Sequence, residues 1–311
     1  MKKFKIPVII AVFTLSIFSQ FGLLAQTKNL SGMETFETKK IEVQGEIFTY
    51  RQYYNNKGKN PPLILFNHTR GNLDSWDPLF LNTLSTDRDV IVFNNKGVAS
   101  SGGKTPDNFK QMADDAYSFI SALGFEKVDI LGFSIGGCVA QEMLMEHPEI
   151  VRKAILAGTA PKGARSINER NPKIIEVVTA PILDENSFLL LFFSPTKNSQ
   201  QLGKLFWKRK QSNPYPKDRD VNKESAKAQA IARANWGKDF LEEDTYAQIS
   251  IPVLVANGKD DIMMPTENSV HLFKLFPNAQ LNLYPDSGHG FLFQYPEQVA
   301  TDFNHFLNAK N

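Results

Sequence analysis

Short apolar runs alternate with longer amphipathic stretches along most of this chain. The runs that predict strands are residues 63–66, 89–93, 127–131, 154–156, 251–256 and 280–284. This alternation predicts an α/β fold in which helices cover both faces of a mostly parallel sheet. Residues 108–123 place apolar side chains at helical spacing, which predicts a helix there. Residues 38–54 predict an antiparallel hairpin at the sheet edge, with Gln44-Gly45 as its turn.

A serine bracketed by glycines stands where one predicted strand passes into a helix. The sequence Gly-Phe-Ser-Ile-Gly-Gly (residues 132–137) follows the apolar run 128–131 and precedes a helix-like run. A tight turn at such a junction can hold a serine hydroxyl clear of the sheet, and the glycines let neighbouring backbone approach closely. Ser134 is therefore a candidate nucleophile, provided that a base and an acid exist elsewhere.

A histidine and three carboxylates later in the chain can supply the base and the acid. His289 lies in a loop between two glycines, whereas His271 and His305 fall on amphipathic helical stretches. A serine hydroxyl needs a histidine to take its proton, and the histidine needs a carboxylate to fix its tautomer. The chain order serine, acid, histidine is one known arrangement. The candidate acids are Asp260, Asp261 and Asp286.

Together these motifs resemble those of the α/β-hydrolase superfamily of esterases, lipases and carbon–carbon bond hydrolases, from about residue 48 onward. In that family the catalytic Asp stands three residues after a Gly and four before a Pro, and the sequence NGKDDIMMP matches this pattern at Asp261. The resemblance implies an α/β-hydrolase fold with Ser134, Asp261 and His289 as the triad. The other two acids are alternatives if the loop is set differently.

The loop after residues 63–66 departs from the family pattern. Relatives carry His-Gly before the residue whose backbone N–H binds the oxyanion, and this chain has Asn67-His68 before Thr69. The resemblance implies an oxyanion hole formed by the amides of Thr69 and Ile135, because two convergent donors stabilise the charge that develops on the substrate oxygen. We expect His68 to pack against this loop rather than to take part in catalysis.

The strand pattern stops between residues 163 and 248, where the sequence is helical and interrupted by prolines. In similar hydrolases an insertion at this point is a helical cap over the serine. The apolar run 187–193 and Trp207 predict either a pocket wall or the core of the cap itself. The basic run 204–210 predicts a solvated helix face. The expected organisation is a signal peptide (1–25), a first core segment (26–162), the cap (163–248) and a second core segment (249–311).

The N-terminus predicts export. Lys2, Lys3 and Lys5 precede an apolar run that ends near Ala25, which is typical of a secretory signal peptide cleaved after Ala25. The protein would then be periplasmic or secreted, with an uncleaved N-terminal membrane anchor as the alternative. Removal of residues 1–25 leaves 32 basic and 33 acidic side chains, a balance that argues against a nucleic-acid partner.

Other chemistries lack the residues that they require. The sequence contains no HExxH or CxxC motif, no GxGxxG after a strand and no phosphate loop, so we expect neither a metal nor a cofactor. Cys138 is the single cysteine, which excludes an internal disulfide and predicts a small buried side chain.

The sequence thus predicts a serine hydrolase that cleaves a small to medium ester or related carbonyl substrate through an acyl-enzyme. The same residues also suit carbon–carbon bond hydrolysis, lactone opening or perhydrolysis. A non-catalytic ligand-binding protein on a hydrolase scaffold is the alternative from another class.

Overall fold

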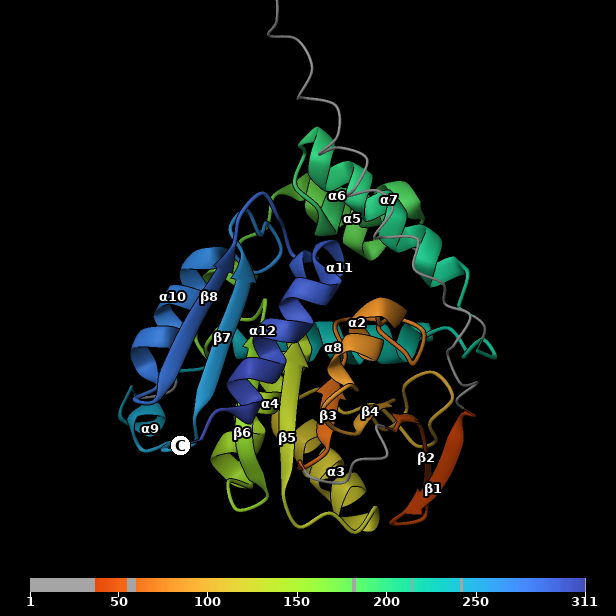
Figure 1. The fold of residues 1–311 in the computed structure, drawn as a ribbon, viewed down its shortest axis with the longest axis vertical. Helices are drawn as coiled ribbons and strands as arrows, with labels where there is room; N and C mark the ends of the chain where they lie inside the picture. The colour runs from red at the N-terminus through yellow and green to blue at the C-terminus, as the bar shows by residue number, and fades with distance from the viewer. Residues whose placement is uncertain (1–36, 55–59, 181–182, 214, 241–242, 311) are drawn as a thin grey trace, which may run out of the picture. The chain divides into compact units, whose positions relative to one another are not determined.

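An eight-stranded, mostly parallel sheet forms the centre of the computed structural model, which describes residues 37–54, 60–180, 183–213, 215–240 and 243–310 (Figure 1). The strand order is β1-β2-β4-β3-β5-β6-β7-β8. Only the pairs β1–β2 and β2–β4 are antiparallel among the described strands. The strands are β1 (Lys39–Val43), β2 (Glu46–Tyr53), β3 (Leu63–Phe66), β4 (Val90–Phe93), β5 (Val128–Phe133), β6 (Val151–Ala157), β7 (Val253–Gly258) and β8 (Ala279–Tyr284).

Helices cover both faces of the sheet, which confirms the predicted fold class (Figure 1). On one face α2 and α12 pack together, with the rings of Phe80 and Phe303 meeting edge to face at 6.1 Å. On the other face α3 packs against α4. The helices are α2 (Pro78–Leu84), α3 (Phe109–Ala122), α4 (Ile135–Glu146), the 3-10 turn η1 (Arg165–Ile167), α5 (Pro172–Thr179), α6 (Glu185–Phe192), α7 (Lys197–Gln211), α8 (Lys223–Trp236), α9 (Glu243–Ala247), α10 (Thr266–Leu275), α11 (Phe291–Gln294) and α12 (Pro296–Asn308).

Local sequence signals account for several of these elements. The side chain of Asn108 accepts a hydrogen bond from the amide of Gln111 at 2.8 Å and so caps α3 where the apolar spacing begins. The predicted hairpin is confirmed as β1 and β2. Its turn residues Gln44 and Gly45 have φ values of 52° and 82°, the left-handed pair that a tight hairpin turn requires.

The parallel strands bring the functional loops to one edge of the sheet. Strands β3, β5, β6, β7 and β8 run in the same direction, so their carboxyl ends lie at one edge of the sheet. In open α/β sheets this is the edge where ligands bind. Residues 67–71 follow β3, Ser134 follows β5, Asp261 follows β7 and His289 follows β8. The order of the strands therefore gathers residues that are far apart in the sequence.

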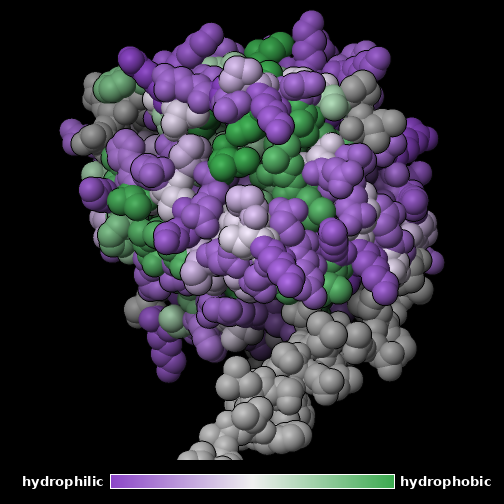
Figure 2. All heavy atoms as spheres, turned by 90° about the horizontal axis from the view of Figure 1, so that it is seen from above, coloured by the Kyte–Doolittle hydropathy of each residue, from purple (hydrophilic) through white to green (hydrophobic). Residues whose placement is uncertain are grey.

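The residues between β6 and β7 form η1 and α5–α9 instead of further strands. Helices α5, α6 and α7 lie beyond the carboxyl ends of the strands, at the top of Figure 1. On this side of the molecule apolar side chains gather within an otherwise hydrophilic surface (Figure 2). Ile175 of α5 and Leu190 of α6 are 44% and 38% exposed.

The predicted signal peptide, residues 1–25, lies outside the described residues. Within the described part of the chain, every helix is too short or too polar to cross a bilayer.

Candidate active site

Ser134 occupies a strained turn between β5 and α4. Its φ of 59° and ψ of −122° are a conformation that side-chain-bearing residues rarely adopt. The turn is fixed by the Ser134 amide, which donates to the carbonyl of Ala157 at 2.9 Å. A β-carbon at Gly132 would lie 2.3 Å from the carbonyl oxygen of Gly136, so only glycine lets the backbone close this tightly.

The first turn of α4 also lies against the end of β3. A β-carbon at Gly136 would lie 2.2 Å from the carbonyl oxygen of Phe66 and 2.8 Å from that of Asn67. The loop that begins at Asn67 is therefore held next to the turn that carries Ser134. This close approach brings Thr69 and Ser134 to the same cavity.

His289 and Asp261 form a buried pair. The Nδ1 atom of His289 lies 2.7 Å from Oδ2 of Asp261, and the two residues are 1% and 5% exposed. The other carboxylate oxygen of Asp261 accepts hydrogen bonds from the amides of Met263 (2.7 Å) and Met264 (2.9 Å). These contacts fix the carboxylate, which in turn fixes the imidazole. The imidazole also packs against Phe133, with ring centroids 4.8 Å apart.

The two alternative acids bind the segment that follows α6 instead of the imidazole. Asp260 accepts a hydrogen bond from the hydroxyl of Ser194 at 3.3 Å. Asp286 accepts hydrogen bonds from the side chains of Thr196 (2.6 Å) and Asn198 (2.9 Å) at the start of α7. Both carboxylates therefore have partners that account for their positions.

The amides of Thr69 and Ile135 are available to a ligand. Ile135 is the first residue of α4, where backbone N–H groups have no partner within the helix. Neither amide donates a hydrogen bond to another residue in the described ranges. The loop around Thr69 is held by the Gly71 amide, which donates to the carbonyl of His68 at 2.9 Å, and by the Arg70 amide, which donates to Gln229 at 2.8 Å.

His68 packs within the loop, as expected, and it also lines the cavity. Its Nδ1 lies 2.8 Å from the carbonyl oxygen of Thr69, and its ring meets those of Phe133 and Phe192 edge to face, each at 5.5 Å. Burial lowers the pKa of His68 to about 3, so the imidazole is neutral at physiological pH. In the neutral ring, Nδ1–H donates to the carbonyl oxygen of Thr69. This hydrogen bond stabilises the loop that carries the Thr69 amide, a candidate oxyanion donor.

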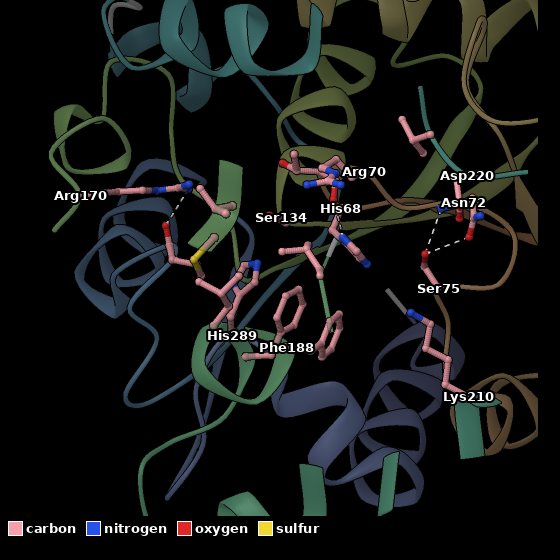
Figure 3. Close-up of a pocket in the computed structure, with 17 residues that line it drawn as sticks. His68, Arg70, Asn72, Ser75, Ser134, Arg170, Phe188, Lys210, Asp220 and His289 are labelled. Carbon is pink, nitrogen blue, oxygen red and sulfur yellow. Dashed lines mark hydrogen bonds between the residues drawn. The ribbon is translucent and has the colours of Figure 1, made fainter. Parts of the chain in front are cut away.

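Ser134, His289 and Thr69 line one cavity of about 260 Å³ (Figure 3). Phe188, Leu191 and Phe192 supply an apolar wall from α6. Other residues of the predicted apolar run pack inward, since Leu189 and Phe193 surround Gly203 of α7. This run therefore contributes side chains both to the cavity wall and to the packing of α6 against α7. Trp207 contacts Phe188, with ring centroids 5.7 Å apart, and is not among the residues that line the cavity.

The cavity is also lined by charged residues that the sequence analysis did not place at the site. Arg70, Arg170 and Lys210 line it together with Asp220. The prediction that residues 204–210 form a solvated helix face is wrong for Arg209, which binds Asp77, and for Lys210, which faces the cavity. Helical spacing places residues on faces of α7, but the sequence does not show which face meets the cavity. It therefore could not distinguish these two residues from the exposed Lys204 and Lys208.

Within the described ranges, no group of three or more His, Cys, Asp or Glu side chains could hold a metal ion. Cys138 is buried, and burial raises the pKa of its thiol to about 12, which keeps the thiol protonated.

Comparisons with known proteins agree with this architecture. The model of the alpha/beta hydrolase fold family matches residues 61–296. A poly(3-hydroxyalkanoate) depolymerase of Ectopseudomonas oleovorans is 30% identical over 257 residues, which cover 80% of this chain and 85% of the depolymerase. A 2-hydroxy-6-oxo-6-phenylhexa-2,4-dienoate hydrolase of Burkholderia cepacia is 24% identical over 84% of this chain and 92% of that hydrolase. A solved structure of an alpha/beta hydrolase fold protein from Chitinophaga pinensis has a TM-score of 0.83 and 39% identity, covering 89% of this chain and 98% of that one.

The chain therefore belongs to the α/β-hydrolase fold family, as its motifs had indicated, and it is a hydrolase enzyme.

Proposed function

We propose that this protein is a serine hydrolase that cleaves a small to medium carboxylic ester through an acyl-enzyme on Ser134. The observation that carries the proposal is the wall of a single cavity. Ser134, in its strained turn, and the imidazole of His289 lie on that wall. The Nδ1 atom of His289 lies 2.7 Å from Oδ2 of the buried Asp261. These are the groups that nucleophilic catalysis by serine requires.

In the proposed reaction, Ser134 Oγ bonds to the ester carbonyl carbon while its proton passes to His289 Nε2. Because Nδ1 is engaged with Asp261, Nε2 is the nitrogen that faces the reaction. The amides of Thr69 and Ile135 donate to the carbonyl oxygen as it becomes negative. The alcohol leaves with the proton from His289. Water then attacks the acyl carbon, giving one proton to His289, and the acid leaves as Ser134 regains its proton.

The volume of the cavity supports a substrate with a small to medium acyl group. A volume of about 260 Å³ with an apolar wall from α6 admits a compact acyl group. We propose that residues 163–248 act as the cap over Ser134, with Phe188, Leu191 and Phe192 as the side chains that contact the acyl group. The relative named as a poly(3-hydroxyalkanoate) depolymerase supports ester chemistry in particular.

Kinetics with a chain-length series of para-nitrophenyl esters test this function. For Ser134→Ala we expect a loss of kcat of about 10³- to 10⁶-fold. Ser75→Ala is the matched control, because Ser75 lines the same cavity and its hydroxyl lies 3.2 Å from Asn72, within the β3–α2 connection. Equal retention of turnover in both variants would refute the proposed nucleophile. If the folded wild-type protein turns over none of these esters, lactones and carbon–carbon substrates are the next compounds to assay.

We also propose that the protein is exported, with residues 1–25 as its signal peptide. Expression of the full chain in a Gram-negative host followed by intact mass analysis tests this. A mature protein that begins at Gln26 and lies in the periplasm is expected. A full-length chain in the membrane fraction would support the anchor instead.

A further inference from the structure

Lys210 is a cation that faces the cavity without an anionic partner. It lies one residue before the end of α7, and its ammonium lies over the rings of Phe188 at 5.3 Å and Trp207 at 5.2 Å. Within the described ranges its ammonium makes no hydrogen bond, and no carboxylate lies within 4.0 Å of it. Figure 3 shows the side chain pointing into the cavity from the side opposite His289.

The surroundings of Lys210 favour a bound anion. Partial burial lowers the pKa of Lys210, and Asp74 and Asp220 oppose this effect from a distance, so this half-buried ammonium lacks a close counter-charge. The aromatic faces stabilise the charged form but offer no lone pair to its N–H groups. A carboxylate would meet that need with charge-assisted hydrogen bonds.

The charged side chains that line the cavity have a net positive charge, as Lys210 does. Arg70 and Arg170 also line it, and their guanidinium groups donate to the backbone carbonyls of Ala180 (2.7 Å) and Met263 (3.2 Å). Among the described lining residues, Asp220 carries the one carboxylate, and it is exposed. Three cations against one anion make the cavity attractive to a negatively charged ligand.

We infer that the substrate is an ester that also carries a carboxylate, and that Lys210 binds this carboxylate while Ser134 attacks the ester carbonyl. The inference rests on the proposed function and specifies its substrate. In Figure 3, Phe188 lies between His289 and Lys210, so the two polar ends of the substrate are separated by an apolar stretch. A half-ester of a dicarboxylic acid fits this order. Hydrolysis of the half-ester monoanion consumes one water and yields the dicarboxylate, the alcohol and one proton.

Matched pairs of esters test the inference. Mono(para-nitrophenyl) adipate carries the carboxylate, and para-nitrophenyl heptanoate is a neutral ester of similar length. The readout is the ratio of their kcat/KM values in wild type, Lys210→Met and Lys208→Met. Methionine keeps most of the lysine stem over the aromatic rings and removes the charge. Lys208 is an exposed lysine of the same helix and is the matched control.

We expect wild type to prefer the adipate, and Lys210→Met to lower the adipate-to-heptanoate ratio by about 10- to 100-fold, because a hydrogen bond to a charged group is lost. Lys208→Met should leave the ratio within about twofold of wild type. An unchanged ratio in Lys210→Met, with ester turnover that still depends on Ser134, would overturn this inference and leave the proposed function standing.

A binding measurement gives an answer that does not depend on turnover. Monomethyl adipate is titrated calorimetrically into Ser134→Ala and into Ser134→Ala/Lys210→Met, with methyl heptanoate as the neutral ligand. Weaker binding of monomethyl adipate in the double variant, by the same factor as the kinetic loss, supports the inference. Equal affinity for both proteins contradicts it, even if no ester proves to be a substrate.

Discussion

The imidazole of His289 lies 2.7 Å from the carboxylate of Asp261, although the two residues lie on different loops, after β8 and after β7. The carboxylate has no freedom to turn away, because its second oxygen accepts hydrogen bonds from the amides of Met263 and Met264. The pairing of β7 with β8 brings the two loops together. A change at Asp261 is therefore expected to act through the orientation and charge of His289.

Asp261→Asn should lower kcat by about 10⁴-fold, as is found when the acid of a serine protease triad is replaced by its amide. The amide stabilises the wrong tautomer of His289 and does not stabilise the imidazolium. Asp260→Asn is the control, since Asp260 contacts the hydroxyl of Ser194 and not the imidazole. Ester hydrolysis by the purified variants is the measurement. Similar losses in both variants would show that neither carboxylate has a specific role.

Gly136→Ala should lower both stability and kcat. Its β-carbon would lie 2.2 Å from the carbonyl oxygen of Phe66, and backbone there cannot move aside without displacing the loop that carries Thr69. We expect a loss of about 1–3 kcal/mol in the free energy of unfolding, together with a fall in kcat that exceeds any change in KM. Urea melts and ester kinetics measure the two effects.

The control for Gly136→Ala is Gly124→Ala. Gly124 has a φ of 80° and nothing within 4 Å of an added β-carbon, so this variant should lose stability through backbone strain alone. A fall in kcat of equal size in both variants would mean that reduced stability, and not a displaced loop, explains the loss of activity.

Asp129→Asn should destabilise the fold without affecting the chemistry. Asp129 is fully buried near the start of β5, at the opposite end of this strand from Ser134, and its carboxylate pairs with Arg88 at 2.6 Å and Arg152 at 2.5 Å. Removing one member of a buried ionic cluster leaves uncompensated charge and costs about 3–5 kcal/mol. The exposed Glu126→Gln should change stability by less than about 0.5 kcal/mol. A matching loss of kcat in folded Asp129→Asn protein would contradict this separation.

His68 should make the protein less stable in mild acid. Its pKa is about 3 in the folded protein because of burial, whereas a histidine in the unfolded chain titrates near 6.5. Below pH 6.5 only the unfolded chain gains the proton, so this contribution to stability falls as the pH falls. Relative to His68→Leu, wild type should lose about 1 kcal/mol in its free energy of unfolding between pH 6 and pH 5. Parallel pH profiles of the two proteins would show that His68 titrates normally in the folded state.

Much of the fold follows from local signals in the sequence. The apolar runs predicted the parallel strands, the helical spacing over residues 108–123 predicted α3, and the glycines around Ser134 predicted the turn that the structure contains. Each of these features depends on neighbours within a few positions, so a single sequence carries the information.

The cavity could be predicted less well, because its wall joins segments that are distant in the chain. Lys210 and the exposed Lys208 lie in one basic run, and the packing of α7 against α6, α2 and α11 decides that Lys210 faces the cavity. The family pattern favoured Asp261 among the three candidate acids, but the sequence alone did not show what Asp260 and Asp286 contact. Their hydrogen bonds distinguish them, since Asp260 and Asp286 hold the segment after α6.

Covalent labelling of the purified protein with a fluorophosphonate, followed by peptide mass mapping, tests the proposed nucleophile most directly. We expect one adduct, on Ser134, in the wild-type protein and none in Ser134→Ala, and we expect the adduct to form much more slowly in Asp261→Asn. That result would show that the serine is nucleophilic and depends on the His289–Asp261 pair. An unlabelled wild-type protein, or an adduct that persists in Ser134→Ala, would contradict the central claim.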